Sequence, residues 1–492
     1  MILLDAEDQQ QHPKLQYHVA GATARPPESS LNASQPSLPD YETSQAQHSP
    51  QPFLNRKYPF FNTVDTRFWR AALYALAIYV VLTIAIGVPL LITRIAKHKI
   101  PHPHPADSSF LATPLEYANA KVFAMDRNCN AWDISDEFSA SVSHSLSAQG
   151  SFSIRSTAWQ EAAAETGSPI YGNLTVDVNP DPSVSSAVFH VTVLSSIPLF
   201  YENSHICFND DGSDRGLSVY IPSNFSGSES LTINVFLLFP QTTVLSLNNL
   251  VTYLPMFSQR IGALAPRVSF DQVEIEGSSM DIHCDSLKAR QITVQNSLAA
   301  ISGSYNASSS LKLDTISAPI NANITLVQDD TSKAPTYLSL DTGNGEINAN
   351  VTMLADASQL VLHPMIYMGH VKNFNAPLRL NVAHHPSTPP ARLELIVENH
   401  QAESNVTLDD KFVGIFDVQS KLSSASVEWD NHGSGSSPTR NVVYDETSST
   451  SRRHGWIGWG SRPEKWDQHK EGRVVLVSSL SPVLLQLGSG MS

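Results

Sequence analysis

The sequence predicts a mainly β protein that combines one transmembrane helix, a β-rich and sandwich-like region, and a β-solenoid of short repeats. Three observations predict this fold class. The run Ala71–Ile92 holds 22 residues without a charge. Apolar and polar residues alternate in short runs from about residue 111 onward. One 17-residue pattern recurs after 27 residues.

The uncharged run predicts a transmembrane helix over 68–94. A helix of 22 residues is about 33 Å long, enough for the roughly 30 Å hydrocarbon core of a bilayer. A signal peptide lies closer to the start of a chain, which disfavours that interpretation. Residues 1–67 are rich in Gln, Pro and Ser and predict a disordered cytoplasmic tail. Residues 95–110, with alternating prolines from Pro101 to Pro105, predict a stiff spacer.

Glycosylation sequons give the predicted helix a direction. Sequons are acceptor sites in the lumen of the secretory pathway, so their clustering after the run places the C-terminal part in the lumen or outside the cell. We therefore expect a single-pass protein located in the plasma membrane or in a secretory-pathway membrane. The predicted glycosylation sites are Asn173, Asn224, Asn306, Asn323, Asn350 and Asn405.

Residues 111–262 predict a β-rich region that is either sandwich-like or irregular. The run Leu174–Val178 alternates apolar and polar residues, and Gly, Pro, Asn and Asp separate it from similar runs. An oxidising compartment permits one disulfide among three cysteines. We predict that Cys129 pairs with Cys207, because both flank the first half of the exterior domain. Cys284 is then expected to be a buried small side chain.

Residues 263–430 predict the solenoid. Ser310–Leu326 reads SLKLDTISAPINANITL and Tyr337–Met353 reads YLSLDTGNGEINANVTM, with nine of 17 positions identical. A fainter copy occupies Ile292–Tyr305. Short strand pairs that recur at this spacing are typical of stacked coils. In each copy the apolar residues of INAN alternate with asparagines, so Asn323 and Asn350 are expected to point to solvent, one coil apart.

Residues 431–470 predict a low-complexity loop that contains Trp456 and Trp459, and residues 471–492 predict two short terminal strands. The two tryptophans could stack on the rings of a ligand. They could equally close the open end of the solenoid, which we favour. Both interpretations are tested by where the side chains lie.

The chain carries no GxSxG, HExxH, P-loop or GxGxxG motif, so we predict no catalytic residue, no cofactor and no metal site. The acidic cluster Asn209–Asp214 could bind Ca²⁺, although a turn is the favoured interpretation. Asp314 and Asp341 recur in the repeat and could form a sugar-cleaving pair, although turn residues are again favoured. The net charge of −15 disfavours nucleic acid as a partner.

The LDT…INAN coils resemble the adhesin-like repeats that form β-helical domains in many bacterial and fungal proteins. The whole plan is also similar to uncharacterised single-pass proteins of basidiomycete fungi, through Cys129-Asn-Ala-Trp132 and Ser479–Leu487. This resemblance implies a β-helical fold and a surface location, and it carries no catalytic residues.

Three functions follow as hypotheses. The first is a membrane-anchored glycoprotein whose adhesin-like exterior contacts cell-wall polysaccharide or a surface protein without catalysis. The second is a membrane-tethered carbohydrate-active enzyme that uses the acidic residues of the solenoid. The third is a structural subunit of a membrane complex.

Overall fold

The structure is a computed structural model of the chain. It describes Cys129 and residues 133–157, 170–198, 205–211, 214–221, 230–241, 244–328, 334–355, 365–429, 440–463 and 471–488. The predicted tail, the run Ala71–Ile92, the Pro/His spacer and Asn224 lie outside the described residues. The chain divides into two units, 1–102 and 103–492, and all described residues belong to the second.

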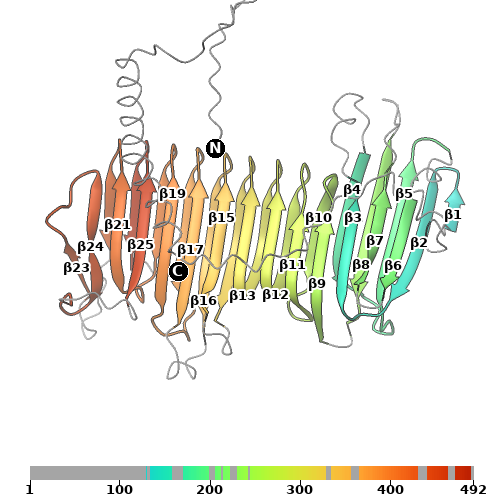
Figure 1. Cartoon of the computed structure of the whole chain (residues 1–492), viewed down its shortest axis with the longest axis horizontal. Coiled ribbons are helices and arrows are strands. Elements are labelled where there is room, and N and C mark those ends of the chain that lie inside the picture. The colour runs from blue at the N-terminus through green and yellow to red at the C-terminus, as the bar shows by residue number, and fades with distance from the viewer. Residues whose placement is uncertain are drawn as a thin grey trace, which may run out of the picture. The chain divides into compact units, whose positions relative to one another are not determined.

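The described residues form 26 strands that stack side by side in two facing layers (Figure 1). Their hydrogen bonds form one network, because β12 and β13 bend and contribute to both layers. Layer A contains, in spatial order, β1 (Asp133–Asp136), β2 (Ser139–Leu146), β5 (Ala187–Ser195), β8 (Leu231–Phe239), β4 (Ile170–Val178), β10 (Phe257–Ala263), the first halves of β12 (Ile282–Asn296) and β13 (Ile301–Thr315), β14 (Ile320–Val327), β16 (Ile347–Leu354), β18 (Leu378–His384), β20 (Ser404–Leu408), β26 (Val483–Leu487) and β22 (Ala425–Trp429).

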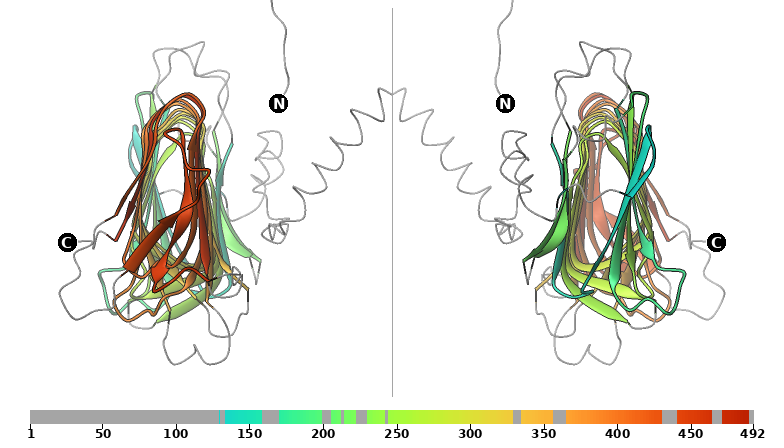
Figure 2. Two further views of the ribbon diagram at one scale, coloured as in Figure 1. Left: turned by 90° about the vertical axis from the view of Figure 1, so that its left-hand side faces the viewer. Right: turned by 90° about the vertical axis from the view of Figure 1, so that its right-hand side faces the viewer.

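Layer B faces layer A across the core (Figure 2). It contains, in spatial order, β6 (His205–Asp211), β7 (Asp214–Tyr220), β3 (Ser151–Ser156), β9 (Leu245–Tyr253), β11 (Val268–Glu276), the second halves of β12 and β13, β15 (Thr336–Thr342), β17 (Ile366–Asn373), β19 (Arg392–Asn399), β25 (Gly472–Ser478), β21 (Gly414–Ser420), β24 (Arg452–Trp459) and β23 (Arg440–Tyr444).

The central strands form parallel coils, each with one strand in either layer. Leu311 of β13 lies opposite Leu338 of β15, and Ile320 of β14 lies opposite Ile347 of β16. These are the positions that the 27-residue repeat aligns, so the repeat and the coil coincide. Alternate residues face the core: Leu340 and Ile347 are fully buried, as period-two strands packed on one face require.

Buried polar residues stabilise the tight turns that lead from layer B to layer A. In seven coils the last residue of the layer B strand is polar and at most 4% exposed, and four residues separate it from the layer A strand. In five of the seven the side chain accepts a hydrogen bond from its own turn, as in Gly345 N to Thr342 Oγ1 at 3.1 Å. In five the side chain donates to a neighbouring coil, as in Asn373 Nδ2 to Gly345 O at 2.9 Å. The turn residues are Asn296, Thr315, Thr342, Asn373, Asn399, Ser420 and Ser478.

The order of the coils in space departs from their order in the chain at the C-terminal end. The coil β25–β26 lies between the coils β19–β20 and β21–β22, parallel to both (Figure 1). We call it the closing coil. Strands β24 and β23 then extend layer B beyond β21 as antiparallel neighbours.

The predicted fold class is wrong. Among the described residues no helix is long and apolar enough to span a membrane, and the regular structure is made of strands. The region 111–262 is also not a separate sandwich, because its strands belong to the same two layers as the repeats. Among the described residues of this region, antiparallel pairs occur only between β1 and β2, β2 and β5, β5 and β8, and β6 and β7. Alternating hydropathy is the same for a strand in a sandwich and in a coil, so it could not distinguish them.

The predicted low-complexity loop also differs from the structure. Its later part contains β23 and β24; β23 pairs with β24, and β24 pairs with β21. The run Arg440–Tyr444 is short and lies in Ser- and Gly-rich sequence. Antiparallel pairing with β24, which itself pairs with the edge of β21, explains why this short run becomes a strand.

Cys284 is fully buried, and burial raises the pKa of its thiol to about 12. Because the thiolate is the reactive form, the native protein should resist alkylation at neutral pH. We expect iodoacetamide to modify Cys284 only after urea unfolding, read by mass spectrometry. Rapid modification of the native chain would contradict this placement.

Candidate binding groove on layer A

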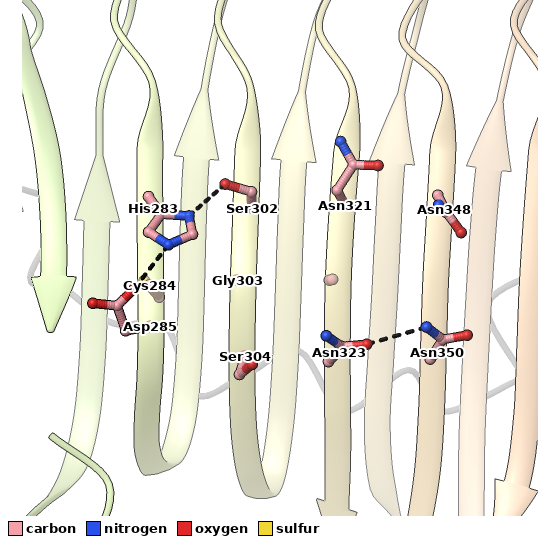
Figure 3. Close-up of a pocket in the computed structure, with 11 residues that line it drawn as sticks. His283, Cys284, Asp285, Ser302, Gly303, Ser304, Asn321, Asn323, Asn348 and Asn350 are labelled. Carbon is pink, nitrogen blue, oxygen red and sulfur yellow. Dashed lines mark hydrogen bonds and ion pairs between the residues drawn. The ribbon is translucent and has the colours of Figure 1, made fainter. Parts of the chain in front are cut away.

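A shallow polar groove of about 410 Å³ crosses the outer face of layer A at the centre of the solenoid (Figure 3). Strands β12, β13, β14 and β16 form its floor. The polar side chains along it are His283, Asp285, Ser302, Ser304, Asn321, Asn323, Asn348 and Asn350. Each belongs to the solvent-facing set of its strand, since the alternate residues Cys284, Ala322 and Ala349 are buried.

His283 links two other groove residues. Its Nδ1 lies 2.8 Å from Ser302 Oγ and its Nε2 lies 2.9 Å from Asp285 Oδ1 (Figure 3). Arg260 Nη2 donates to Asp285 Oδ2 at 3.0 Å. The hydrogen bonds from Arg260 and His283 lower the pKa of Asp285. This series of hydrogen bonds fixes the orientation of the His283 imidazole and leaves the Ser302 hydroxyl at the groove surface.

Asparagines form a ladder along the other side of the groove. Asn350 Nδ2 donates to Asn323 Oδ1 at 3.1 Å, and Asn381 Nδ2 donates to Asn350 Oδ1 at 2.8 Å. The register aligns Ser304, Asn323, Asn350 and Asn381 across four strands. Amides in such a row present donors and acceptors at the strand spacing of about 4.8 Å.

A close approach of two strands shapes the groove floor. Gly303 has a φ of +133°, where glycine is favoured. A Cβ built there would lie 2.0 Å from the Cys284 carbonyl oxygen. Any larger residue would therefore push β13 away from β12, beneath His283 and Ser302.

The predicted glycosylation sites differ in accessibility. Asn173, Asn323 and Asn350 are exposed, whereas Asn306 and Asn405 are only partly exposed. Asn173 Nδ2 donates to Asn234 Oδ1 at 2.9 Å. The expected outward phase of Asn323 and Asn350 agrees with these positions. Both line the groove, so a glycan on either would occupy it.

We expect that no molecule carries glycans on both Asn323 and Asn350. The two amides are bonded to each other on neighbouring strands, and a spacing of about 4.8 Å leaves no room for two sugar stems. Glycopeptide mass spectrometry of the chain produced in a glycosylating host tests this, with Asn173 as the isolated comparison site. Detection of doubly occupied peptides would contradict it.

The structure separates the two predicted tryptophans. Trp456 of β24 is only 3% exposed, and its Nε1 donates to Glu471 Oε1 at 3.0 Å. Trp459 is 44% exposed at the end of the same strand. Burial removes Trp456 from contact with a ligand in this conformation, while Trp459 is available for one.

The structure joins Cys129 and Cys207 in a disulfide. Asp314 and Asp341 lie opposite each other on the outer face of layer B, away from the groove. Lys312 Nζ is 2.9 Å from Asp314 Oδ2. Burial, and after it the charge of Asp314, raises the pKa of Asp341. In the acidic cluster, Asp210 pairs with Arg215 at 3.1 Å.

Sequence reasoning missed His283, Asp285 and Ser302. The available signal was the offset of 19 residues between the faint copy and the first full copy, because it aligns His283 with Ser302 and Ser302 with Asn321. Extending the outward phase by two coils toward the N-terminus would have placed all three on the face of Asn323. Among the described residues, no group of three or more His, Cys, Asp or Glu could hold a metal ion.

Neither a family model nor a curated protein matches the chain. Two solved structures are similar to it in part. A proposed cell adhesion protein from Clostridium sporogenes is 7% identical over 70% of this chain and 98% of that chain, with a TM-score of 0.15. A proposed adhesin from Bacteroides fragilis is 8% identical over 71% and 98%, with a TM-score of 0.25. These scores are too low to carry an argument.

Proposed function

We propose that the protein is a non-catalytic, adhesin-like binding protein that holds a neutral saccharide in the groove on layer A. The observation that carries this proposal is the polar lining of that groove on a rigid, regularly spaced floor. Its partner would be a cell-wall polysaccharide or the glycan of a surface protein.

The chemistry of the groove supports this ligand class. The amides of Asn321 and Asn348 and the hydroxyl of Ser302 supply both donors and acceptors, which sugar hydroxyls require. Arg260, the cation bonded to Asp285, has its charge matched by that carboxylate. A net charge of −15 also disfavours polyanions. A repeating neutral chain fits a row of equivalent groups better than a single charged ligand does.

The proposed location is outside the cell or within the secretory pathway. The disulfide between Cys129 and Cys207 supports it, because such bonds persist in oxidising compartments. The sequons support the same location, and a glycan on Asn173, which does not line the groove, would leave the groove open.

A glycan array tests the proposal. The intact chain is expected to bind neutral oligosaccharides, and the variant Asn321→Ala/Asn348→Ala should lose at least tenfold of that signal. The matched control is Asn344→Ala/Asn375→Ala, which changes two exposed turn asparagines away from the groove. Equal binding by both double variants would place the site elsewhere, and absence of any binding would refute the proposal.

A second candidate function rests on the pair Asp314 and Asp341. Their opposed positions and the raised pKa of Asp341 suit a general acid beside a carboxylate, as in glycosidases. Under this proposal, wall polysaccharide is hydrolysed and Asp341→Asn abolishes turnover. The control Lys372→Gln, which removes a charge near Asp341, should only shift the pH profile. Turnover that survives Asp341→Asn would exclude this site.

A further inference from the structure

The closing coil enters the solenoid out of chain order. The chain leaves β19–β20 and builds β21–β22 two strand positions away. It then forms β23 and β24 and returns to fill the gap with β25–β26. Until residues 472–487 arrive, the facing edges of β19, β20, β21 and β22 have no partner strand from this part of the chain. We call this gap the acceptor slot.

The closing coil is bonded along both sides of the slot. Its turn contributes Leu480 N to His400 O at 2.9 Å on one side. Lys421 N to Ser478 O at 3.1 Å joins the other side. Ser420 Oγ donates to Ser481 O at 3.0 Å, which continues the row of buried turn residues through the inserted coil. The fit is therefore specific in register and in turn chemistry.

The inward side chains of the closing coil fill the core between its neighbours. Val474, Leu476 and Leu485 are fully buried, and Val483 and Leu487 are 1% exposed. The outward residues Arg473 and Gln486 continue the outer faces. The hydrogen bonds and apolar contacts that fill the slot thus come from one strand-turn-strand segment.

The segment follows β24 through the connection between Trp459 and Gly472. Trp456 Nε1 donates to Glu471 Oε1 just before the closing coil begins. Among the described residues, the strand pairings that fill the slot come from residues 472–487, so the same residues of a second copy would supply the same pairings.

We propose that the acceptor slot can take the closing coil of a second copy of this chain, which links copies through a shared coil. The physical basis is strand addition, in which backbone hydrogen bonds and alternate side-chain pockets recognise an extended segment. The chain's own coil competes for the slot at an effective concentration in the millimolar range. The coil of a second copy competes at the protein concentration, so linkage between copies should rise with protein concentration during folding. This inference is independent of the saccharide site.

Chains that each carry one added cysteine test the proposal, with Cys284 replaced by Ala and the Cys129–Cys207 disulfide kept oxidised throughout. Glu394 and Arg473 lie opposite each other on β19 and β25. One chain carries Glu394→Cys together with Leu476→Asp, which disables its own closing coil. The other carries Arg473→Cys. After unfolding and joint refolding, a disulfide between the two chains is expected, in an amount that rises with concentration.

Two control variants make the result decisive. A second chain with both Arg473→Cys and Leu476→Asp should give no interchain bond. One chain with Glu394→Cys and Arg473→Cys should form the bond within itself. If that intrachain bond forms while the mixture of chains never cross-links, the slot accepts only its own coil and the proposal is overturned. If neither bond forms, the closing coil does not lie beside β19, which also overturns it.

Discussion

Ending the chain at Glu471 is expected to release the C-terminal end of the solenoid while the rest stays folded. The deletion removes five apolar side chains that are at most 1% exposed. Burial of aliphatic side chains contributes about 1.5–3 kcal/mol each, so the loss is on the order of 10 kcal/mol. Coils interact mainly with their neighbours, which confines the damage to β21–β24.

Limited proteolysis with mass spectrometry measures this effect. Cleavage should concentrate after Leu408, and the fragment that contains β2–β20 should persist. The matched control ends at Gly488, which keeps the whole closing coil and should match the intact chain. An unchanged proteolysis pattern after deletion from Gly472 would mean that β21–β22 stack directly on β19–β20.

Replacing Asn373 by Ala is expected to destabilise the solenoid by about 2–3 kcal/mol, because it removes the side-chain donor of the buried Gly345 carbonyl and one of the two side-chain donors to Ala376 O. Asn373 Nδ2 donates to Gly345 O and to Ala376 O, each at 2.9 Å. The side chain is 2% exposed, so water cannot replace these bonds.

Chemical denaturation monitored by circular dichroism gives the free energy of unfolding. The control Asn373→Thr should retain much of the stability, because Thr315 and Thr342 occupy the same turn position in other coils. The nearby exposed change Asn375→Ala should cost little. Equal stability of the Asn373→Ala and Asn375→Ala variants would contradict the role of the buried turn residues.

The central coils could be predicted because two copies keep the same residues at the same phase. Ile320 and Ile347 face the core and Asn323 and Asn350 face solvent, as period-two alternation requires. The same alternation near Leu174 was compatible with a sandwich, and only the pairing partners distinguish the two folds. Local hydropathy does not specify which strands pair over long distances in the sequence.

A weaker sequence pattern marks the turns of seven coils, including coils without an identifiable copy of the repeat. Seven segments share a polar residue, a small residue three positions later and, in six of them, an apolar residue five positions later, as in Thr315, Ala318 and Ile320. Divergence at the intervening positions hides this pattern from a search for identical residues. The out-of-order closing coil has no local signal, because Ser478 and Val483 look the same whether their coil is stacked last or inserted.

The sequence predicts some of the groove residues but not the groove. Asn323 and Asn350 were expected on the outer face, but as glycosylation sites. His283 and Ser302 come from two successive coils with little identity to the copies, and only the register across β12, β13 and β14 aligns them with the asparagines.

A crystal structure of the chain with an array-selected neutral oligosaccharide tests the central claim most directly. We predict density for the sugar along layer A, with hydroxyls hydrogen-bonded to Ser302, Asn321 and Asn348. Sugar bound beside Trp459 or across Asp314 and Asp341, with an empty groove, would contradict the account.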